Sequence, residues 1–364
     1  MSSTKQPKAG VEGARSQPTF AEAFSELERD ALAPGVIQRV FSAILAGAWT
    51  PGQIAGFLVA LRLRGESAQT IAEAAAALRE AMLPVAHQHA RVLDTCGTGG
   101  DGQATVNIST GAAIIAAAHA AEAGRALVIA KHGNRAVTSR SGSADVLEAL
   151  GISPPPSVEI AARSLDEVGI AFLMAPNHHP AMRFAAPVRS DLGIRTLFNC
   201  LGPLANPAGA THQLLGAYSF HLLSILAETL RSLGTTRAWV VRSEDGLDEL
   251  SPFGPTRVVE LSSGELRAFE ISPDDFGLGL SPPGAIAGGD AAWNADVLRQ
   301  VLSGAPHPAR DAFLLNAAAA LVVAEQLTPR EAAQRAAQLI DSGAAQAALE
   351  RWRRFSDQHA VGKK

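Results

Sequence analysis

The sequence predicts an α/β protein in which a small N-terminal helical domain precedes a large α/β domain with a mixed, mainly parallel central sheet flanked by helices. From about residue 20 to 86, apolar residues recur at helical spacing, as at Ile54, Leu58 and Leu61, and no β-branched run has strand spacing. After Val92, apolar strand-like runs, Gly-rich or polar loops and Ala-rich helices alternate. The length of 364 residues also favours two domains over one.

The elements of the second region can be placed in order along the chain. Two runs flank Ser262-Ser263-Gly264 and predict a β-hairpin, so we expect the sheet to be mixed. Residues 196–227 contain no Asp, Glu, Lys or Arg, but Pro203 and Pro207 interrupt them, so we expect buried loop and strand rather than a membrane span. The predicted strands are 91–95, 126–130, 170–174, 238–242, 257–261 and 265–271, and the predicted helices include 111–122, 222–233 and several within 291–355.

Composition excludes several classes of protein. The 31 Lys and Arg against 35 Asp and Glu give a net charge of −4, so a general nucleic-acid binder is not expected. Because the uncharged run 196–227 is interrupted, a membrane protein is not expected either. Two cysteines, Cys96 and Cys200, are too few for a disulfide framework and lack zinc-site spacing. We therefore expect a cytoplasmic protein. We find no signal peptide in the first twenty residues, and we expect them to form a loose tail without an assigned role.

A Gly-rich segment follows the first predicted strand. Four glycines between Gly97 and Gly102 let backbone N–H groups converge on one point, and Ser109 and Thr110 add hydroxyls at a helix N-terminus, where anions bind favourably. This pattern predicts an anion cradle. A dinucleotide fingerprint is disfavoured because its third glycine should open the helix and the next strand should end in an acidic residue. A plain Gly-rich turn with Ser109 as N-cap is the simpler alternative.

A cationic segment follows the next predicted strand, over residues 131–145. Lys131, Arg135 and Arg140 stand there with one His and several hydroxyl side chains, although the protein is net negative. This composition favours a loop that holds a polyanion. The alternative is a solvated charged loop in which Ser143 caps a helix that begins near Asp145.

Adjacent carboxylates follow the strand predicted at 238–242, within the segment 243–252. In a protein with two phosphate-binding loops they suggest Mg²⁺, which binds through one or two carboxylates plus substrate oxygens, whereas the alternative is an acidic surface turn. His178-His179-Pro180 is too close-set for a zinc site without partners. The motifs of hydrolases, zinc proteases and P-loop kinases are absent from the sequence.

Taken together and in order, the motifs are more specific than any one of them. Over about residues 20–355 the sequence resembles the anthranilate phosphoribosyltransferases, which catalyse the second step of tryptophan biosynthesis. The segments that carry the resemblance are Asp94-Thr95-Cys96-Gly97-Thr98-Gly99-Gly100-Asp101-Gly102, Asn107-Ile108-Ser109-Thr110, Lys131-His132-Gly133-Asn134-Arg135, Ser141-Gly142-Ser143-Ala144-Asp145, His179-Pro180, Val188-Arg189, Leu201-Gly202-Pro203-Leu204-Ala205-Asn206-Pro207 and Gly246-Leu247-Asp248-Glu249.

The resemblance implies a fold, an assembly and a reaction. It implies a tail over 1–20, a helical domain over 21–88, an α/β domain over 89–364, and a segment near 180–202 that returns to the helical domain. A homodimer would form through the helical domains, and the substrates would meet in the cleft between the two domains. The reaction would move phosphoribose from phosphoribosyl pyrophosphate (PRPP) to the anthranilate amine, with Mg²⁺ as cofactor at two ions per subunit.

The resemblance also implies site residues. The magnesium ligands would be Ser109, Asp248 and Glu249, and the anthranilate contacts would be Gly97, Asn134 and Arg189. No catalytic acid or base is assigned, and Lys131 and Arg189 would act through their charge. Thr138 stands where the family commonly has Ser, and the hydroxyl is kept. The PRPP contacts would be Gly97, Gly100, Asp101, Thr105, Asn107, Ile108, Ser109, Thr110, Lys131, His132, Gly133, Asn134, Arg135, Ala136, Val137, Thr138, Ser139 and Ser143.

Two other functions are compatible with parts of the sequence. A pyrimidine-nucleoside phosphorylase has a related architecture but uses inorganic phosphate without a metal, and Asp248-Glu249 together with 107–110 favour the transferase over it. A non-catalytic relative that binds nucleic acid should have lost phosphate-site residues and gained basic surface. The motifs quoted above are intact and the net charge is negative.

Overall fold

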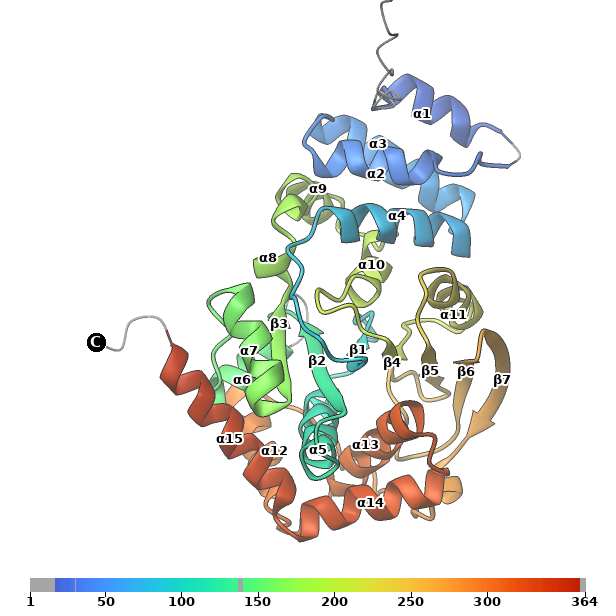
Figure 1. Ribbon diagram of the computed structural model, residues 1–364. Helices are drawn as coiled ribbons and strands as arrows, with labels where there is room; N and C mark the ends of the chain where they lie inside the picture. Colours follow the sequence, from blue (N-terminus) through green and yellow to red (C-terminus); the bar gives the residue numbers. More distant parts are fainter. Residues whose placement is uncertain (1–16, 30, 137–139, 361–364) are drawn as a thin grey trace, which may run out of the picture.

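The protein, seen here as a computed structural model, is described over residues 17–29, 31–136 and 140–360 (Figure 1). Its first four helices occupy the region predicted to be helical. Three of them begin at Thr19, Thr50 and Ser67, whose hydroxyls accept a hydrogen bond from a backbone N–H in the first turn, as N-caps do. The four helices are α1 (Phe20–Leu27), α2 (Val36–Leu45), α3 (Pro51–Arg64) and α4 (Ala68–Glu80).

The rest of the chain is built around a seven-stranded sheet in the order β3-β2-β1-β4-β5-β6-β7. Strands β3 to β5 in this order are parallel, whereas β6 and β7 are antiparallel to their neighbours. The mixed, mainly parallel sheet is thus confirmed, and so is the hairpin. The strands are β1 (Arg91–Gly97), β2 (Leu127–Gly133), β3 (Ile170–Met174), β4 (His212–Gly216), β5 (Arg237–Ser243), β6 (Thr256–Ser262) and β7 (Glu265–Ile271).

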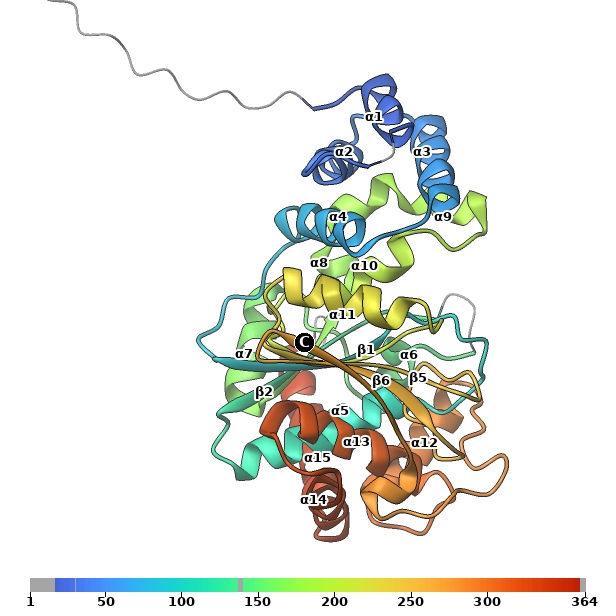
Figure 2. The ribbon, with the colours of Figure 1, turned by 90° about the vertical axis from the view of Figure 1, so that its right-hand side faces the viewer.

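Helices cover both faces of the sheet, as Figure 2 shows edge-on. Helices α5 and α13 contact one face, and α7 and α11 contact the other. Together with two 3-10 turns, η1 (Pro180–Phe184) and η2 (Pro273–Phe276), the remaining helices are α5 (Ile108–Glu122), α6 (Ser143–Ala149), α7 (Val158–Val168), α8 (Ala175–His178), α9 (Ala186–Leu192), α10 (Phe198–Leu204), α11 (Leu222–Ser232), α12 (Ala291–Leu302), α13 (Arg310–Glu325), α14 (Pro329–Asp341) and α15 (Ala344–His359).

A segment from the middle of the chain lies between the first helices and the sheet. Here η1 contacts α2, α9 contacts α3, and α10 contacts α4. Apolar side chains from these elements, from α11 and from β4, β5 and β6 form one continuous core. The expectation of loop and strand for 196–227 was incomplete, because α10 forms there although Pro203 lies within it. Pro203 has no N–H to donate to the Asn199 carbonyl, and the burial of α10 against its neighbours outweighs this loss.

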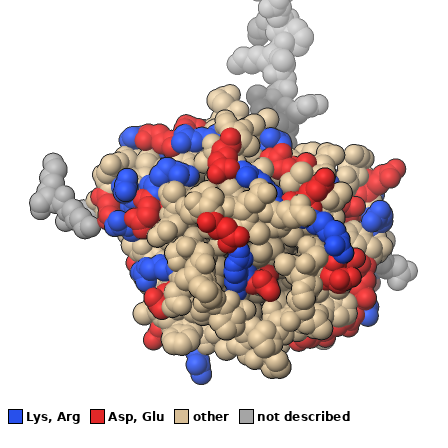
Figure 3. Space-filling view, turned by 90° about the horizontal axis from the view of Figure 1, so that it is seen from below, with Lys and Arg blue, Asp and Glu red and all other residues tan. Residues whose placement is uncertain are grey.

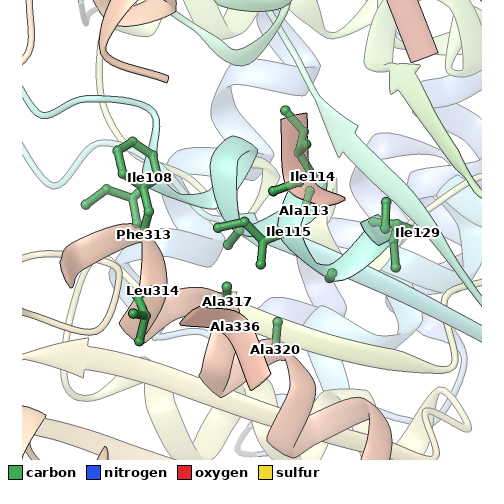
Figure 4. Packing of buried hydrophobic residues seen from close by; sticks show 14 of the residues in the cluster. Ile108, Ala113, Ile114, Ile115, Ile129, Phe313, Leu314, Ala317, Ala320 and Ala336 are labelled. Carbon is green, nitrogen blue, oxygen red and sulfur yellow. The ribbon is translucent and has the colours of Figure 1, made fainter. Parts of the chain in front are cut away.

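The larger core lies on the opposite face of the sheet, between β1, β2, α5 and α13. Figure 4 shows Phe313 of α13 against Ile108 and Leu314, with alanines of α13 and α14 beside them. The alanine-rich sequences of α5 and α13 allow these helices to approach closely, and a Cβ added to Gly111 would collide with the Phe313 ring. Phe313 is 1% exposed. Removal of the Phe313 ring would therefore leave a cavity in this core.

Shortening Phe313 to alanine is expected to cost about 3 to 5 kcal/mol of unfolding free energy, because a buried aromatic ring is lost and a cavity remains. Urea denaturation followed by circular dichroism measures the loss. Leu280→Ala is the matched control, because Leu280 is 68% exposed and its truncation should change stability by less than about 0.5 kcal/mol. Equal losses in the two variants would contradict this account of the core.

On the face that Figure 3 shows, Lys and Arg are interspersed with Asp and Glu, and neither sign forms a continuous patch. Within the described residues no single helix is long and apolar enough to cross a membrane; only the sharply bent pair α13 and α14 passes by length and composition when taken together.

Candidate active site at the carboxyl ends of β1, β2, β4 and β5

The predicted site segments meet at one edge of the sheet. The Gly-rich segment follows β1, the cationic segment overlaps the end of β2, and the carboxylates follow β5. Strands β1 and β4 are neighbours at the point where the strand order reverses, which is where ligands bind in open α/β sheets. Gly97 and Gly216 are directly paired at the ends of these two strands.

The carboxylates of Asp248 and Glu249 lie against the Gly-rich segment and α5. The backbone N–H of Gly99 donates to Asp248 Oδ2 at 3.1 Å, and that of Ser109 donates to Glu249 Oε1 at 2.9 Å. A side chain on Gly97 would collide with the Asp248 carboxylate, and one on Gly216 would collide with the Asp248 carbonyl. The two paired glycines therefore make room for the carboxylate loop. Sequence reasoning had given Gly216 no role.

The electrostatics of this pair fit a divalent cation. Burial, followed by the negative charge of Asp101, raises the pKa of Asp248. Burial, followed by the charge of Asp248, raises the pKa of Glu249. Within the described residues no group of three or more His, Cys, Asp and Glu side chains is placed to hold a metal ion. Oxygen donors that repel each other and are too few for a closed site suit Mg²⁺, which completes its coordination with water and substrate oxygens.

Asn316 of α13 anchors the backbone that follows the two carboxylates. Its Oδ1 accepts from the N–H of Leu250 at 3.0 Å, and its Nδ2 donates to the carbonyls of Leu250 and Ala312, both at 3.0 Å. Asn316 is 2% exposed and belongs to α13. Sequence reasoning missed it, although an asparagine within the apolar run 312–324 was a signal that a buried amide has a backbone partner.

Lys131 lies in a strand rather than in a loop. The prediction that the strand ends at residue 130 was wrong, because β2 continues through Gly133, where it pairs with β3. Lys131 is 2% exposed, and its Nζ donates to the Thr95 carbonyl at 2.6 Å and to Ser109 Oγ at 3.3 Å. Burial lowers its pKa, and the nearby Asp94 opposes that shift. Lys131 thus links the end of β1, just before the Gly-rich segment, to Ser109 at the start of α5.

The cationic segment beyond β2 is more exposed. Arg135 is paired with Asp145 at 3.0 Å and also with Glu148, so its charge is compensated within the protein. Ser143 opens α6 and its hydroxyl donates to the Asn134 carbonyl at 3.2 Å, whereas Gly142 is the N-cap. The alternative in which Ser143 caps a helix near Asp145 was therefore wrong. Ala136 is half-buried, and Val137, Thr138 and Ser139 lie outside the described residues.

The other residues predicted to contact PRPP between Gly100 and Thr110 differ in exposure. Gly100 is exposed and adopts a positive φ of 75°, and Asp101 is half-buried with its Oδ1 accepting from the Gln103 N–H at 3.0 Å. Thr105 forms an isolated antiparallel bridge with Ala287. Ile108 and Thr110 are fully buried.

Helix α5 begins at Ile108, three residues before the predicted Gly111. The Glu249 carboxylate accepts the Ser109 N–H, a free donor of the first turn, and so stabilises this earlier start.

A cavity of about 500 Å³ opens beside these segments, and it is mostly apolar. The three residues singled out for the aromatic substrate, Gly97, Asn134 and Arg189, all line it. The Arg189 guanidinium lies 5.5 Å from the centre of the Phe198 ring, and burial lowers its pKa. Among the described residues Arg189 forms no ion pair. An unpaired, partly desolvated cation in an apolar cavity is suited to bind a carboxylate.

Two histidines form a neutral part of the cavity wall. The rings of His132 and His179 are 5.2 Å apart, and His132 Nδ1 is 2.9 Å from the Gly202 carbonyl. Burial, with the charges of neighbouring histidines, lowers the pKa of His132 to about 3 and that of His179 to about 4. Both imidazoles are therefore uncharged near neutral pH. The sequence had placed His132 in the phosphate loop, whereas its ring lines the cavity.

Arg195 connects the Gly-rich segment to the segment that lies under the first helices. Its guanidinium donates to the Gly100 carbonyl and lies 4.5 Å from the centre of the Tyr218 ring. The Tyr218 N–H in turn donates to Thr98 Oγ1 at 2.9 Å. Sequence reasoning missed Arg195 because it lies 95 residues from Gly100 along the chain.

Comparison with family models gives one family for both regions. Residues 89–346 match the a/b domain of a glycosyl transferase family, and residues 27–82 match the helical bundle domain of that family.

Anthranilate phosphoribosyltransferases from several organisms are similar to this chain. Anthranilate phosphoribosyltransferase of Rubrobacter xylanophilus is 49% identical over 327 residues, which is 89% of this chain and 94% of that protein. The crystal structure of the Thermus thermophilus enzyme is 41% identical with a TM-score of 0.85, covering 92% of this chain and 99% of that one. The Saccharomyces cerevisiae enzyme in complex with PRPP and Mg is 30% identical with a TM-score of 0.84, covering 94% and 99%. A complex of the same enzyme with 4-fluoroanthranilate is 29% identical with a TM-score of 0.83, covering 93% and 99%.

Proposed function

This chain belongs to the anthranilate phosphoribosyltransferases of the glycosyl transferase family, and we propose that it carries out their reaction where β1, β2, β4 and β5 end. It transfers the phosphoribosyl group of PRPP to the amine of anthranilate in tryptophan biosynthesis, giving phosphoribosylanthranilate and diphosphate. The observation that carries the proposed site is the convergence of the Gly-rich segment, the Asp248–Glu249 pair and the Arg189 cavity at one edge of the sheet.

The PRPP would bind across the Gly-rich segment and the start of α5. Exposed backbone at Gly100, the side chain of Asn107 and the Ser109 hydroxyl supply polar groups there, and Lys131 adds positive charge from below. Mg²⁺ would be held by Asp248, Glu249 and Ser109, with two ions per subunit, and the yeast relative bound to PRPP contains Mg. When bound, Mg²⁺ would neutralise the charge that develops on the departing diphosphate.

Anthranilate would occupy the cavity. Arg189 would pair with its carboxylate, and the neutral rings of His132 and His179 together with Phe198 would surround its own ring. This orientation leaves the amine toward Gly97, at the border between the cavity and the Gly-rich segment. Because an aryl amine is uncharged at neutral pH, it needs no strong base before it attacks. The chain's contribution is therefore positioning and electrostatic stabilisation rather than acid–base chemistry.

Replacing Arg189 by alanine is expected to raise the KM for anthranilate by about 10- to 100-fold, since a charge-assisted pair to the substrate carboxylate is lost. The KM for PRPP should stay near the wild-type value, because Arg189 lines only the cavity. Steady-state kinetics with each substrate varied in turn separates the two effects. Arg183→Ala, an exposed arginine on the same cavity, is the control. An unchanged KM for anthranilate would exclude Arg189 as the carboxylate partner.

The fluorescence of anthranilate tests the activity itself. Fluorescence should fall only when protein, PRPP and Mg²⁺ are all present, and EDTA should stop the fall. A parallel incubation with thymidine and inorganic phosphate tests the nucleoside phosphorylase alternative, which needs no metal. Thymidine cleavage without loss of anthranilate would overturn the assignment.

The proposal also includes a domain boundary, a homodimer and a cellular location. The helical and α/β domains would divide between residues 88 and 89, as the two family-model matches on either side suggest. A homodimer would form through the helical domain, where Leu63 on α3 is 84% and Phe24 on α1 is 38% exposed. The protein would act in the cytoplasm, where thiols such as the free Cys96 and Cys200 stay reduced. Light scattering on the purified chain tests the dimer directly.

A further inference from the structure

The segment that precedes α12 lies directly behind the Gly-rich segment. The Val106 N–H donates to the Ile286 carbonyl at 3.0 Å, and the Gly288 N–H donates to the Ala104 carbonyl at 2.8 Å. A side chain on Gly288 would collide with the Thr105 backbone, so the contact requires glycine there. This close pairing brings Asn294, in the first turns of α12, next to Asn107 although 187 residues separate them.

Asn294 is 1% exposed, and its amide forms a short chain of hydrogen bonds. The Gly289 N–H donates to Asn294 Oδ1 at 2.8 Å, and Asn294 Nδ2 donates to Asn107 Oδ1 at 2.9 Å. A backbone N–H can only donate, so the atom of Asn294 that faces Gly289 must be oxygen. The other atom is then the NH₂ group, and it must face the oxygen of Asn107. The Gly289 N–H thus fixes the donor and acceptor roles along this series of hydrogen bonds.

Asn107 consequently keeps a side-chain donor that no described residue uses. Although Asn107 is the N-cap residue of α5, its side chain makes no capping hydrogen bond to the helix. With its oxygen held by Asn294, its NH₂ group is left for a ligand, and among the described residues no protein acceptor receives it. An NH₂ group at that place attracts the oxygens of an anion, whereas a carbonyl oxygen would repel them.

We propose that Asn294 is a positioning residue for the transfer reaction, which fixes the amide of Asn107 with its NH₂ group toward the phosphates of PRPP. The inference rests on the proposed PRPP site, and it assigns a role to a residue outside the motifs of that site. Asn294 itself does not touch the substrate. It acts through Asn107, and its effect should appear in PRPP binding and not in anthranilate binding.

Two variants of Asn294 distinguish this role from simple structural support. Asn294→Asp keeps the acceptor for the Gly289 N–H but places a second oxygen against Asn107, which must then turn its NH₂ group inward. Asn294→Ala leaves Asn107 free to turn either way. We expect the KM for PRPP to rise about 100-fold in the aspartate variant and about 10-fold in the alanine variant, with the KM for anthranilate unchanged. Assays at about pH 9 favour the ionised form of a buried aspartate.

A double-mutant cycle with Asn107→Ala completes the test. If Asn294 acts through Asn107, adding Asn294→Ala to Asn107→Ala should raise the KM for PRPP no further, because the amide to be oriented is already gone. Gln300→Ala, at an exposed position of the same helix, is the control. Multiplying effects, or equal changes in both KM values, would overturn the positioning role. An unchanged KM for PRPP in Asn107→Ala alone would instead refute the PRPP site.

Discussion

The variant that carries both Asp248→Asn and Glu249→Gln is expected to lose transferase activity by about 1,000-fold or more, since preorganised charge at a phosphate-transfer site contributes several kcal/mol. The amide oxygens can still accept from the N–H groups of Gly99 and Ser109, so the loops should keep their positions. What is removed is the negative charge that a cation requires. The loss of activity should therefore not be a loss of folding.

Thermal unfolding supplies the matching readout. Burial raises the pKa of both carboxyl groups, and the charge of Asp101 adds to the shift of Asp248 as that of Asp248 adds to the shift of Glu249. The folded state therefore binds protons more tightly than the unfolded state, and these groups destabilise the fold as the pH rises above the ordinary pKa of a carboxyl group. Without metal the double variant should be at least as stable as wild type near neutral pH. With PRPP present, Mg²⁺ should raise the Tm of wild type but not of the variant.

The control for this pair is Glu244→Gln in the same loop. Glu244 is exposed and pairs with Arg257 at 2.6 Å, away from the Gly-rich segment. Exposed ion pairs contribute little, so activity and Tm should stay near wild type. Wild-type activity in the double carboxylate variant would show that the metal is held elsewhere.

Replacing Gly216 by alanine is expected to lower activity by about 100-fold, because a displacement of about 1 Å in a positioned group has an effect of that size. The added methyl group would collide with the Asp248 carbonyl, so the carboxylate loop must move away from the Gly-rich segment. Overpacking of this kind also costs about 1 to 3 kcal/mol of stability.

Gly254→Ala is the matched control for Gly216→Ala. It lies further along the same connection between β5 and β6, and its added methyl group would have no neighbour within 4 Å. The Mg²⁺ concentration for half-maximal activity should rise in Gly216→Ala and stay unchanged in Gly254→Ala. An active Gly216→Ala enzyme with normal Mg²⁺ dependence would show that Asp248 does not need its present position.

The sequence allowed the fold to be predicted where local pattern decides it. The strand at 170–174 was predicted with its observed bounds, because a short apolar run between polar residues has few alternatives. Helix α10 was missed because glycine and proline within it outweigh its apolar pattern, although burial among α4 and β2 stabilises it. Tertiary packing overrides local propensity at such places.

The site was predictable only where its groups are contiguous in sequence. The Gly-rich segment and the carboxylate pair can each be recognised from their local composition. Asn294, Asn316, Arg195 and Gly216 do not, because each matters through a partner that lies far away along the chain. The burial of Lys131 was equally hidden, since a lysine at a strand end and one in an open loop have the same local sequence.

The contact between Glu249 and the start of α5 has a consequence for selectivity among the anions of the cell. An isolated phosphate that approaches this helix terminus finds the Ser109 N–H already bound to the Glu249 carboxyl group, so this donor is not available to it. A diphosphate that arrives with a divalent cation meets an attractive ligand at the same place. At the proposed site, this one side chain would disfavour free anions at the helix terminus and favour a diphosphate that arrives with its cation.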